Sequence, residues 1–343
     1  MIGLLGYVAR RLVSALVTVA GVVVVVFFVV RVIPGDSAAL RAGPDADPAV
    51  IQAIRDRYGL DDPLWDQFRS YIGKVIRGDF GTSMRTDASV TTELLARLPA
   101  SLELAIFSLA FAVILGFGLG ISAAALRGTA WDVTVRVIAV MGSSVAIFWL
   151  GLLGIYIFYY RLGWFPAPID RLPLSAFPPP TVTGLYTVDA LLAGDPVLAG
   201  QAAAQVALPA MTVGFVLAAP VTKMVRSALI DSLGRDYVRT ARSVGMPFRT
   251  VLLRDGLRNA MLPIATTVGI VFGYMIGGNV IIESLFSWPG VGQYAYRAIG
   301  AHDLDALQGF VIVVGLLYVA LNLLIDLSYL LIDPRVRLGG REA

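Results

Sequence analysis

Six long apolar stretches constrain this 343-residue chain more than any other feature. A helix needs about 20 mostly apolar residues to cross about 30 Å of hydrocarbon. Six stretches reach that length, namely residues 12–33, 102–126, 133–160, 206–225, 262–285 and 307–332. Each also far exceeds the roughly ten residues of a membrane-barrel strand. The sequence therefore predicts an all-α, polytopic membrane protein whose single transmembrane domain covers residues 1–343.

The placement of Lys and Arg predicts which side of the membrane each terminus occupies, because cytoplasmic loops carry an excess of these residues. With the N-terminus inside, the inner segments hold fifteen of them and the two short outer loops hold three. Segment 34–99 is too long for this rule, and we do not count it. The first apolar stretch is too long for the core of a cleaved signal peptide. We expect both termini in the cytoplasm and segment 34–99 outside.

The chain lacks the residues that most catalytic sites need. It has no Cys and one His, His302, so metal sites and His-dependent triads have no second member. Lys74 and Lys223, the two lysines, lie outside any glycine-rich phosphate loop. The net charge of +3 comes from arginines placed by topology, which does not indicate nucleic acid. We expect no enzyme activity, cofactor or metal in this chain.

Three carboxylates fall within the apolar stretches. A carboxylate at the bilayer centre costs about 2.5–3.5 kcal/mol, but Glu103, Glu283 and Asp326 all lie toward the ends of their stretches. We interpret them as interfacial. An ion-coupled carrier would be expected to have deeper, paired carboxylates and repeated halves with broken helices.

Residues 226–261 form a basic segment between the fourth and fifth apolar stretches. Within it, residues 234–245 predict a short helix ended by glycine, with apolar residues on one face and arginines on another. Pro247 then begins a second short helix. The first helix either docks on a partner protein or rests on anionic lipid, and docking is slightly favoured. The residues assigned to this surface are Arg235, Asp236, Tyr237, Arg239, Thr240, Ala241 and Gly245.

Glycine spacing marks two apolar stretches. Small residues four apart let helices pack closely, either within a chain or across a dimer. This spacing relates Gly116 to Gly120, and Gly269 to Gly273 and Gly277. One face of the fifth stretch continues to Asn279 and Glu283, with Met275 near it, and we assign these three residues to the translocation pathway.

The outer segments have their own signals. Asp47-Pro48 and Asp62-Pro63 each predict a capped helix start in segment 34–99, and the second helix carries an apolar face for the bundle or the membrane surface. This region is either a cap over the pore mouth or a landing surface for an outer partner. Residues 161–205 are rich in proline, so we expect them not to form a long helix but to fold over the outer face. Trp288, in a turn, is interpreted as an interfacial anchor rather than a substrate contact.

The basic segment resembles the cytoplasmic loop of ATP-binding-cassette importer permeases, in the form found in the dipeptide and oligopeptide branch. That resemblance rests on Arg239-Thr240-Ala241, then Gly245, then Leu262-Pro263. Other segments also resemble this branch, so the match spans nearly the whole chain: RVIPGD at 31–36, YGLDDP at 58–63, RGDFGTS at 77–83, FSWPGVG at 286–292 and LIDPRVR at 331–337. The long segment 34–99 is similar to that of the first of two permease subunits.

The resemblance implies a multi-pass permease of the bacterial inner membrane, with the type I fold of these importers. It implies as partners a second permease, one or two cytoplasmic ATPases that bind ATP and magnesium, and an extracytoplasmic peptide-binding protein. The helix at 235–245 would be the coupling helix that sits in a groove on an ATPase. The missing phosphate loop fits this division of labour.

Two positions depart from the family pattern. The Glu-Ala-Ala of the general motif is Arg239-Thr240-Ala241 here, so the ATPase contact cannot rest on Glu. Asp305 stands where the branch usually has proline, at the outer entrance to the last span. Peptides are the expected cargo, and nickel complexes, haem and glutathione are alternatives within the same role. An ion-coupled carrier without an ATPase and a membrane scaffold are the rivals from other classes.

Overall fold

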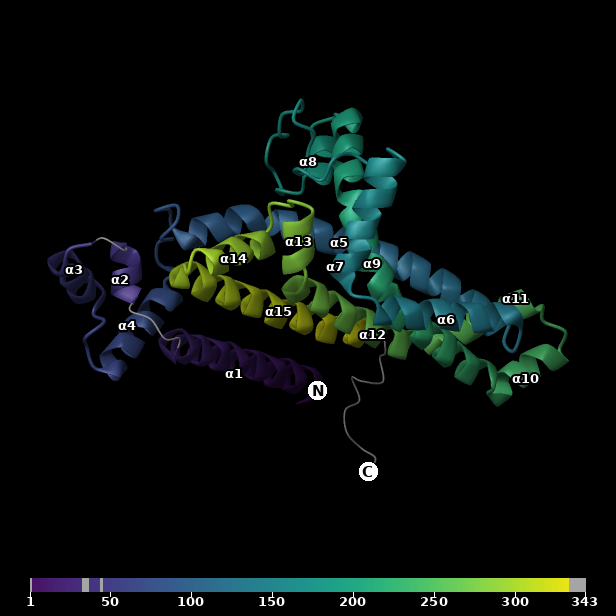
Figure 1. Ribbon diagram of the computed structural model, residues 1–343. Coiled ribbons are helices and arrows are strands. Elements are labelled where there is room, and N and C mark those ends of the chain that lie inside the picture. Colours follow the sequence, from purple (N-terminus) through teal and green to yellow (C-terminus); the bar gives the residue numbers. More distant parts are fainter. Residues whose placement is uncertain (1, 33–36, 44–45, 333–343) are drawn as a thin grey trace.

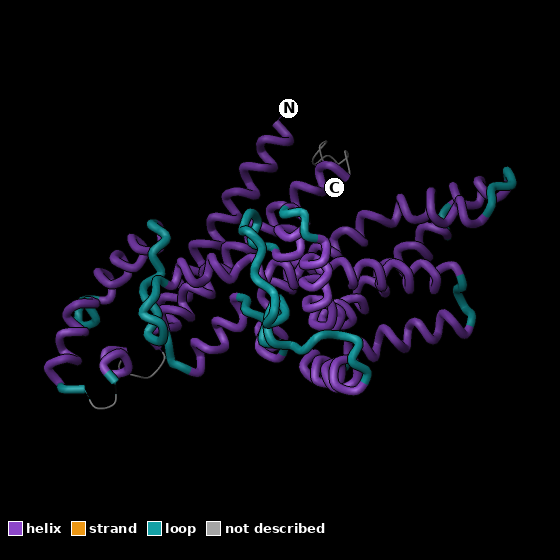
Figure 2. The backbone as a smooth tube through the Cα atoms, turned by 90° about the horizontal axis from the view of Figure 1, so that it is seen from above, coloured by secondary structure: helices purple, strands orange, loops and turns teal. Residues whose placement is uncertain are grey.

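The chain folds into helices joined by turns and loops. A computed structural model describes residues 2–32, 37–43 and 46–332 (Figure 1). Residues 33–36 and 333–337 of the family motifs, and the basic residues Arg335, Arg337 and Arg341, lie outside this part. Within it there is no strand, and Thr82 and Ser89 form an isolated bridge (Figure 2).

Most helical elements follow one another with short connections; the longer ones are residues 77–89 before α5 and the loop before α8. Two of the elements, η1 and η2, are π-helices. Their bounds are α1 Ile2–Val32, α2 Ser37–Ala42, α3 Pro48–Tyr58, α4 Leu64–Ile76, α5 Val90–Ala125, α6 Ala130–Ser144, α7 Ile147–Gly154, η1 Ile155–Arg161, α8 Tyr186–Leu192, α9 Pro196–Leu233, α10 Asp236–Ser243, α11 Phe248–Thr250, η2 Val251–Gly256, α12 Leu257–Gly278, α13 Val280–Leu285, α14 Val291–Gly300 and α15 Leu304–Ile332.

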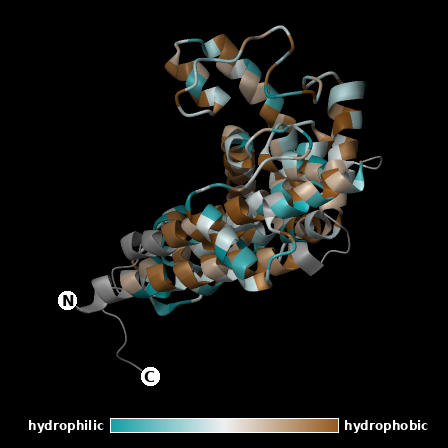
Figure 3. Ribbon diagram, turned by 90° about the vertical axis from the view of Figure 1, so that its left-hand side faces the viewer, coloured by the Kyte–Doolittle hydropathy of each residue, from teal (hydrophilic) through white to brown (hydrophobic). Residues whose placement is uncertain are grey.

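Four helices of the described part are long and apolar enough to cross a membrane: α1, α5, α9 and α15. A fifth span is possible if α6 and the α7–η1 segment count as one, although these are bent by 102°. The fifth predicted stretch is divided between α12 and α13 at Asn279. Figure 3 shows hydrophobic residues recurring along the helices.

The predicted apolar stretch 133–160 is not one straight helix, because α6 and the α7–η1 segment meet at a bend of 102°. Val145 and Ala146 adopt extended conformations between α6 and α7. Just before them, the hydroxyls of Ser143 and Ser144 both donate to the Val140 carbonyl, at 2.9 and 2.8 Å. Serine side chains that bond the backbone in this way compete with the helical ladder, which explains why the helix ends here.

Two other spans begin earlier than predicted. Helix α5 starts at Val90 rather than at residue 102, and it accommodates Pro99 in its first turns. Helix α9 starts at Pro196, so the end of the proline-rich segment 161–205 belongs to a long helix, contrary to the prediction. Proline is compatible with a helix at its first position, and the Asp195 side chain caps this one by accepting from Leu198 N at 2.9 Å.

Helices α3 and α4 follow the predicted order. Asp47 caps α3 as expected, accepting from Ala49 N at 2.9 Å, and Gly59 ends it in the left-handed conformation. The predicted cap at Asp62 is wrong: Pro63 is itself extended, so α4 begins one residue later and has no side-chain cap.

The apolar face of α4 packs on the first span. The Phe68 and Tyr71 rings lie 5.0 and 5.4 Å from the ring of Phe27 in α1. Trp65 and Ile76, at the edge of the same face, are 72% and 79% exposed. The face therefore covers the bundle with part of its surface and leaves the rest open.

The last span begins with a well-satisfied cap. Asp303 is buried, accepts from Ser83 Oγ at 2.6 Å, and accepts from Ala306 N at 3.1 Å. Asp305, where the family pattern has proline, lies in the first turn of α15. A carboxylate is favourable there because the N-terminal end of a helix carries partial positive charge.

The core is centred on the close packing of α5 against α9. A Cβ atom at Gly116 would lie 2.6 Å from Val221, and one at Gly120 would lie 2.7 Å from Val225. This glycine pair therefore packs within the chain. Gly269 packs on Ile325 of α15, Gly273 packs on Tyr318 of the same helix, and the surroundings of Gly277 lie outside the described part.

The α5–α9 contact predicts a position-specific effect of adding a side chain. Gly120→Val would force a branched side chain against Val225 and the Thr222 carbonyl, and such overpacking costs about 1–3 kcal/mol. Gly118→Val is the matched control, because a Cβ atom there meets nothing within 4 Å. We expect thermal unfolding of the purified protein to move to lower temperature for Gly120→Val alone. Equal shifts in the two variants would contradict this packing.

Candidate functional site

Helix α10 lies at one end of the molecule, with α11, whereas α2, α3 and α4 lie at the opposite end (Figure 1). It packs against the π-helix η2. Val238 anchors it as its one fully buried residue. The Tyr237 hydroxyl is hydrogen-bonded to Ser232 Oγ, which in turn donates to the Gly256 carbonyl at 3.0 Å. The helix is thus fixed to both the end of α9 and the start of the following span.

The outer surface of α10 is charged and open to solvent. The side chains of Arg239 and Asp236 are 83% and 95% exposed, with 3.5 Å between Nη1 and Oδ1. An exposed pair of this kind contributes little stability, so both groups remain available to a partner. Of the seven residues assigned to this surface, Ala241 is half-buried and the other six are exposed.

Gly245 ends the helix, as predicted, in a conformation that suits only glycine well. Its φ is +84°, its N–H donates to the Arg242 carbonyl at 3.0 Å, and Met246 N donates to the Ala241 carbonyl at 3.2 Å. These bonds close the C-terminus of α10. Val244 precedes this turn and is 77% exposed, because the helix has already ended at Ser243.

The second short helix expected after Pro247 continues without a break into the next span. Helix α11, η2 and α12 succeed one another from Phe248 to Gly278. Val251 and Leu252 of η2 are buried under α9 and α10. A displacement of α10 would therefore act directly on the base of α12.

The three residues assigned to the pathway are buried inside the chain in this structure. Met275 and Glu283 are each 1% exposed and Asn279 is 5% exposed. Asn279 lies at the break between α12 and α13. None of the three side chains faces an open surface in this conformation.

Glu283 organises the turn before α14. Its Oε1 accepts from Ser101 Oγ at 2.7 Å, and its Oε2 accepts from the N–H groups of Gly292 and Gln293 at 2.7 and 3.0 Å. A Cβ atom at Gly290 would collide with this carboxylate. The glycines of the family-like segment 286–292 therefore allow the turn to approach Glu283 closely.

Trp288 is a core residue. It is 1% exposed and its Nε1 donates to the Ala100 carbonyl of α5 at 2.8 Å. The expectation of an interfacial anchor is wrong here, because the turn folds inward onto α5 rather than outward.

A buried ion pair joins the loop before α8 to α5. Arg171 Nη2 lies 2.6 Å from Glu103 Oε2, and Thr187 donates through N and Oγ1 to Glu103 Oε1 at 2.9 and 2.7 Å. The guanidinium also lies 3.6 Å from the centroid of the Tyr186 ring. Glu103 and Glu283 are thus both buried within the protein, and the Asp326 side chain lies outside the described part.

The loop that carries Arg171 is held by a second carboxylate, Asp189. It accepts from the N–H groups of Val182, Thr183 and Gly184 and from the Thr183 hydroxyl, at 2.7–3.2 Å. Burial by itself would raise the pKa of Asp189, but these hydrogen bonds outweigh it and hold the pKa below its ordinary value. The loop thus keeps a carboxylate ionised on α8, next to the buried pair on α5.

A second ion pair lies at the other end of α5. Asp132 of α6 accepts from Arg226 of α9 in a bidentate pair, Nε to Oδ1 at 2.6 Å and Nη2 to Oδ2 at 2.8 Å. The N–H of Gly128, in the turn after α5, donates to the same carboxylate at 3.1 Å. Asp132 is 1% exposed. This pair ties α6 and the α5–α6 turn to α9.

The sequence analysis missed both ion pairs. Arg226 contributes there only to the count of basic residues on the inner side. Arg171 contributes only to the count of three in the short outer loops. The signal was present, because charges within or beside apolar spans usually pair with one another. The spacing of Glu103 and Arg171 along the chain gave no means of matching them.

Comparison with known proteins places the chain in a family. Residues 116–338 match the sequence model of the binding-protein-dependent transport system inner membrane component, and residues 4–105 match the model of its N-terminal region. The chain is 42% identical over 333 residues to a probable D,D-dipeptide transport system permease protein of Escherichia coli K12, covering 97% of this chain and 98% of that protein.

Two further relatives are similar over almost their whole length. The dipeptide transport system permease protein of Alkalihalophilus pseudofirmus is 35% identical over 334 residues, covering 97% of this chain and 100% of that protein. The glutathione transport system permease protein of Escherichia coli K12 is 36% identical over 334 residues, covering 97% and 99%. The similarity therefore extends from α1 into α15.

The Glu103–Arg171 pair generates a stability prediction. Arg171→Met leaves Glu103 buried without its cation, and removing one partner of a buried pair costs about 3–5 kcal/mol. The double variant Glu103→Gln with Arg171→Met removes both charges and should recover much of that loss. The check is the unfolding midpoint of the purified variants in mild detergent. A double variant no more stable than Arg171→Met would argue against the pair.

Proposed function

Because the chain belongs to the family of binding-protein-dependent transport system inner membrane components, we propose that it forms half of the peptide pathway of an ATP-driven importer. As a member it is a membrane permease subunit without an ATP-binding site of its own. The finer features, namely the cargo, partners, topology and coupling residues, belong to the proposal.

The proposed topology has six spans in the bacterial plasma membrane, with both termini in the cytoplasm. The distribution of Lys and Arg supports it. Helices α1, α5, α9 and α15 supply four spans, the bent α6–η1 segment supplies one, and α12 with α13 supplies the sixth. Segment 34–99 and residues 162–195 then lie outside, and the segment 226–261 lies inside.

The proposed coupling surface is α10, from Arg235 to Gly245, docked in a groove on a cytoplasmic ATPase. One observation carries this: α10 presents exposed charged side chains outward while Val238 and the Tyr237–Ser232–Gly256 hydrogen bonds fix it to the bases of α9 and α12. Such a surface can pass a displacement from a partner to the spans. The nucleotide and its magnesium belong to that partner.

The proposed cargo is a small peptide. The relatives are named for transport of dipeptides, D,D-dipeptides and glutathione, and glutathione is itself a tripeptide. These names favour peptides over nickel complexes or haem. The other proposed partners are a second permease, one or two ATPases, and a peptide-binding protein outside, for which the exposed residues of α4 offer a surface.

The experiment that tests this proposal is purification of the tagged chain from its own cells in mild detergent, followed by mass spectrometry and reconstitution. We expect a second permease and at least one phosphate-loop ATPase to co-purify, and dipeptide uptake by the reconstituted complex to require ATP. Recovery of the chain alone, with uptake driven by an ion gradient, would instead establish the carrier. Recovery of soluble partners with no transport would establish the scaffold.

Gly245→Val tests the coupling surface. A non-glycine residue held in the left-handed conformation costs about 1–2 kcal/mol, which corresponds to a roughly 5- to 30-fold loss of the native geometry. We expect peptide uptake to fall by a similar factor while the complex still assembles and hydrolyses ATP.

Gly234→Val is the matched control for this test. Gly234 lies just before the other end of α10, has φ −78°, and its Cβ atom would meet neighbours at an ordinary 3.6 Å. Uptake should stay close to that of the unmodified protein. Unchanged uptake in Gly245→Val would sink the proposal that α10 transmits closure of the ATPase.

A further inference from the structure

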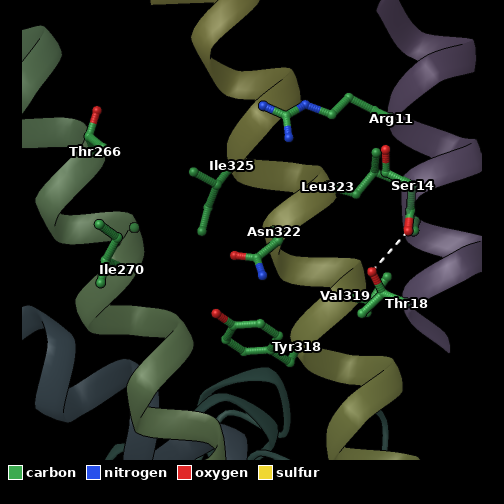
Figure 4. A pocket seen from close by; sticks show the side chains of 12 residues that line it. Arg11, Ser14, Thr18, Thr266, Ile270, Tyr318, Val319, Asn322, Leu323 and Ile325 are labelled. Carbon is green, nitrogen blue, oxygen red and sulfur yellow. Dashed lines mark hydrogen bonds between the residues drawn. The ribbon is translucent and has the colours of Figure 1, made fainter. Parts of the chain in front are cut away.

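A groove of about 490 Å³ lies between α1, α12 and α15 (Figure 4). Polar side chains from all three helices meet in it: Ser14 and Thr18 from α1, Thr266 from α12, and Tyr318 and Asn322 from α15. It lies apart from the buried residues Met275, Asn279 and Glu283. The groove shares no residue with the coupling surface or with the two ion pairs, so the roles described for them do not account for it.

The groove carries several of the polar side chains of these spans, whereas others, such as Thr267 and Tyr274 of α12, lie away from it. Between residues 12 and 29, α1 has only two polar side chains, and both line it. Away from the groove these helices expose apolar groups, as shown by Leu16 at 72% and Leu324 at 61%. A surface that faces only hydrocarbon would not be expected to place hydroxyl and amide groups from three helices around one groove.

The hydrogen bonds of these groups leave them able to bind a ligand. The hydroxyls of Ser14, Thr18 and Thr266 donate to carbonyls of their own helices at 2.9–3.0 Å, so their oxygens can still accept. Among the described residues, none forms a hydrogen bond with the Asn322 amide. An amide left against lipid would be costly. The groove is therefore suited to a polar occupant rather than to acyl chains.

The chemistry of the groove matches the main chain of a peptide. One side-chain amide can donate to a carbonyl and accept from an N–H, which is the pattern every peptide unit offers. Ile270, Val319 and Leu323 supply apolar wall that tolerates different side chains. Arg11 at the rim already has an interaction within the protein, so the groove does not depend on a free cation.

We propose that the groove between α1, α12 and α15 is a stretch of the translocation pathway, where Asn322 and Thr266 contact the main chain of the cargo peptide. This inference rests on the proposed importer function. It places the contact on an exposed face of α12 and α15 instead of in the buried interior around Glu283.

The absence of cysteine from the sequence gives a direct test. Single variants Asn322→Cys, Thr266→Cys and Thr267→Cys would be assembled with their partners in lipid nanodiscs and treated with a charged, membrane-impermeant thiosulfonate. Labelling is read as a mass shift of this chain. Thr267→Cys is the matched control, because it is the neighbouring threonine on the same helix and does not line the groove.

Only a thiolate in water reacts readily, so we expect Asn322→Cys and Thr266→Cys to label about tenfold faster than Thr267→Cys. A saturating dipeptide with its binding protein and a trapped ATP state should slow that labelling. Rates no faster than the control would mean that lipid or a helix of the second permease covers the groove. Fast labelling that the peptide leaves unchanged would mean a water-filled groove that cargo does not touch.

Transport by the unmodified complex distinguishes failure of the groove assignment from failure of the importer proposal. If it imports dipeptides with ATP while the two groove positions give either negative result, only the groove assignment fails. If it imports no peptide at all, the importer proposal itself is wrong.

Discussion

The rest of the structure depends on the close approach of α5 and α9. Glycines at positions 116, 120 and 214 remove the side chains that would hold these two helices apart, so their backbones and branched residues pack directly. Because lipid tails are as apolar as the side chains, close packing of this kind is what drives helices together in a membrane. The other elements are then attached to this pair.

Two buried ion pairs attach further elements to that pair. Glu103 with Arg171 ties the loop before α8 to α5, and Asp132 with Arg226 ties α6 to α9. Each carboxylate also accepts a backbone N–H bond. Thr187 N donates to Glu103 Oε1, the oxygen that Arg171 does not reach, and Gly128 N donates to Asp132 Oδ2, which Arg226 also binds. Removing the charges of such a pair from water costs free energy. In this chain each pair fixes the position of one connection relative to the core.

The sequence was sufficient for the class, the family and the ends of α3 and α10, because each depends on local patterns: apolar length, a capping Asp47, a terminal Gly245. It was insufficient wherever distant residues meet. Nothing along the chain relates Glu103 to Arg171, or Trp288 to the Ala100 carbonyl. Hydropathy did not predict the break at Val145, because a bent helical segment is as apolar as a straight one. The pathway residues were chosen by the periodicity of one helix, whereas burial depends on its neighbours.

The π-helix between α10 and α12 has a mechanical consequence. A π-turn accommodates about one residue more than an α-turn, and each residue of an α-helix turns the chain by about 100°. If η2 changed to α-helical winding, α12 would rotate about its own axis, and the backbone hydrogen bonds within α12 would stay intact. The hydrogen bond from Ser232 to the Gly256 carbonyl lies at the junction of η2 and α12. The winding of η2 therefore determines which way the groove-lining face of α12 points.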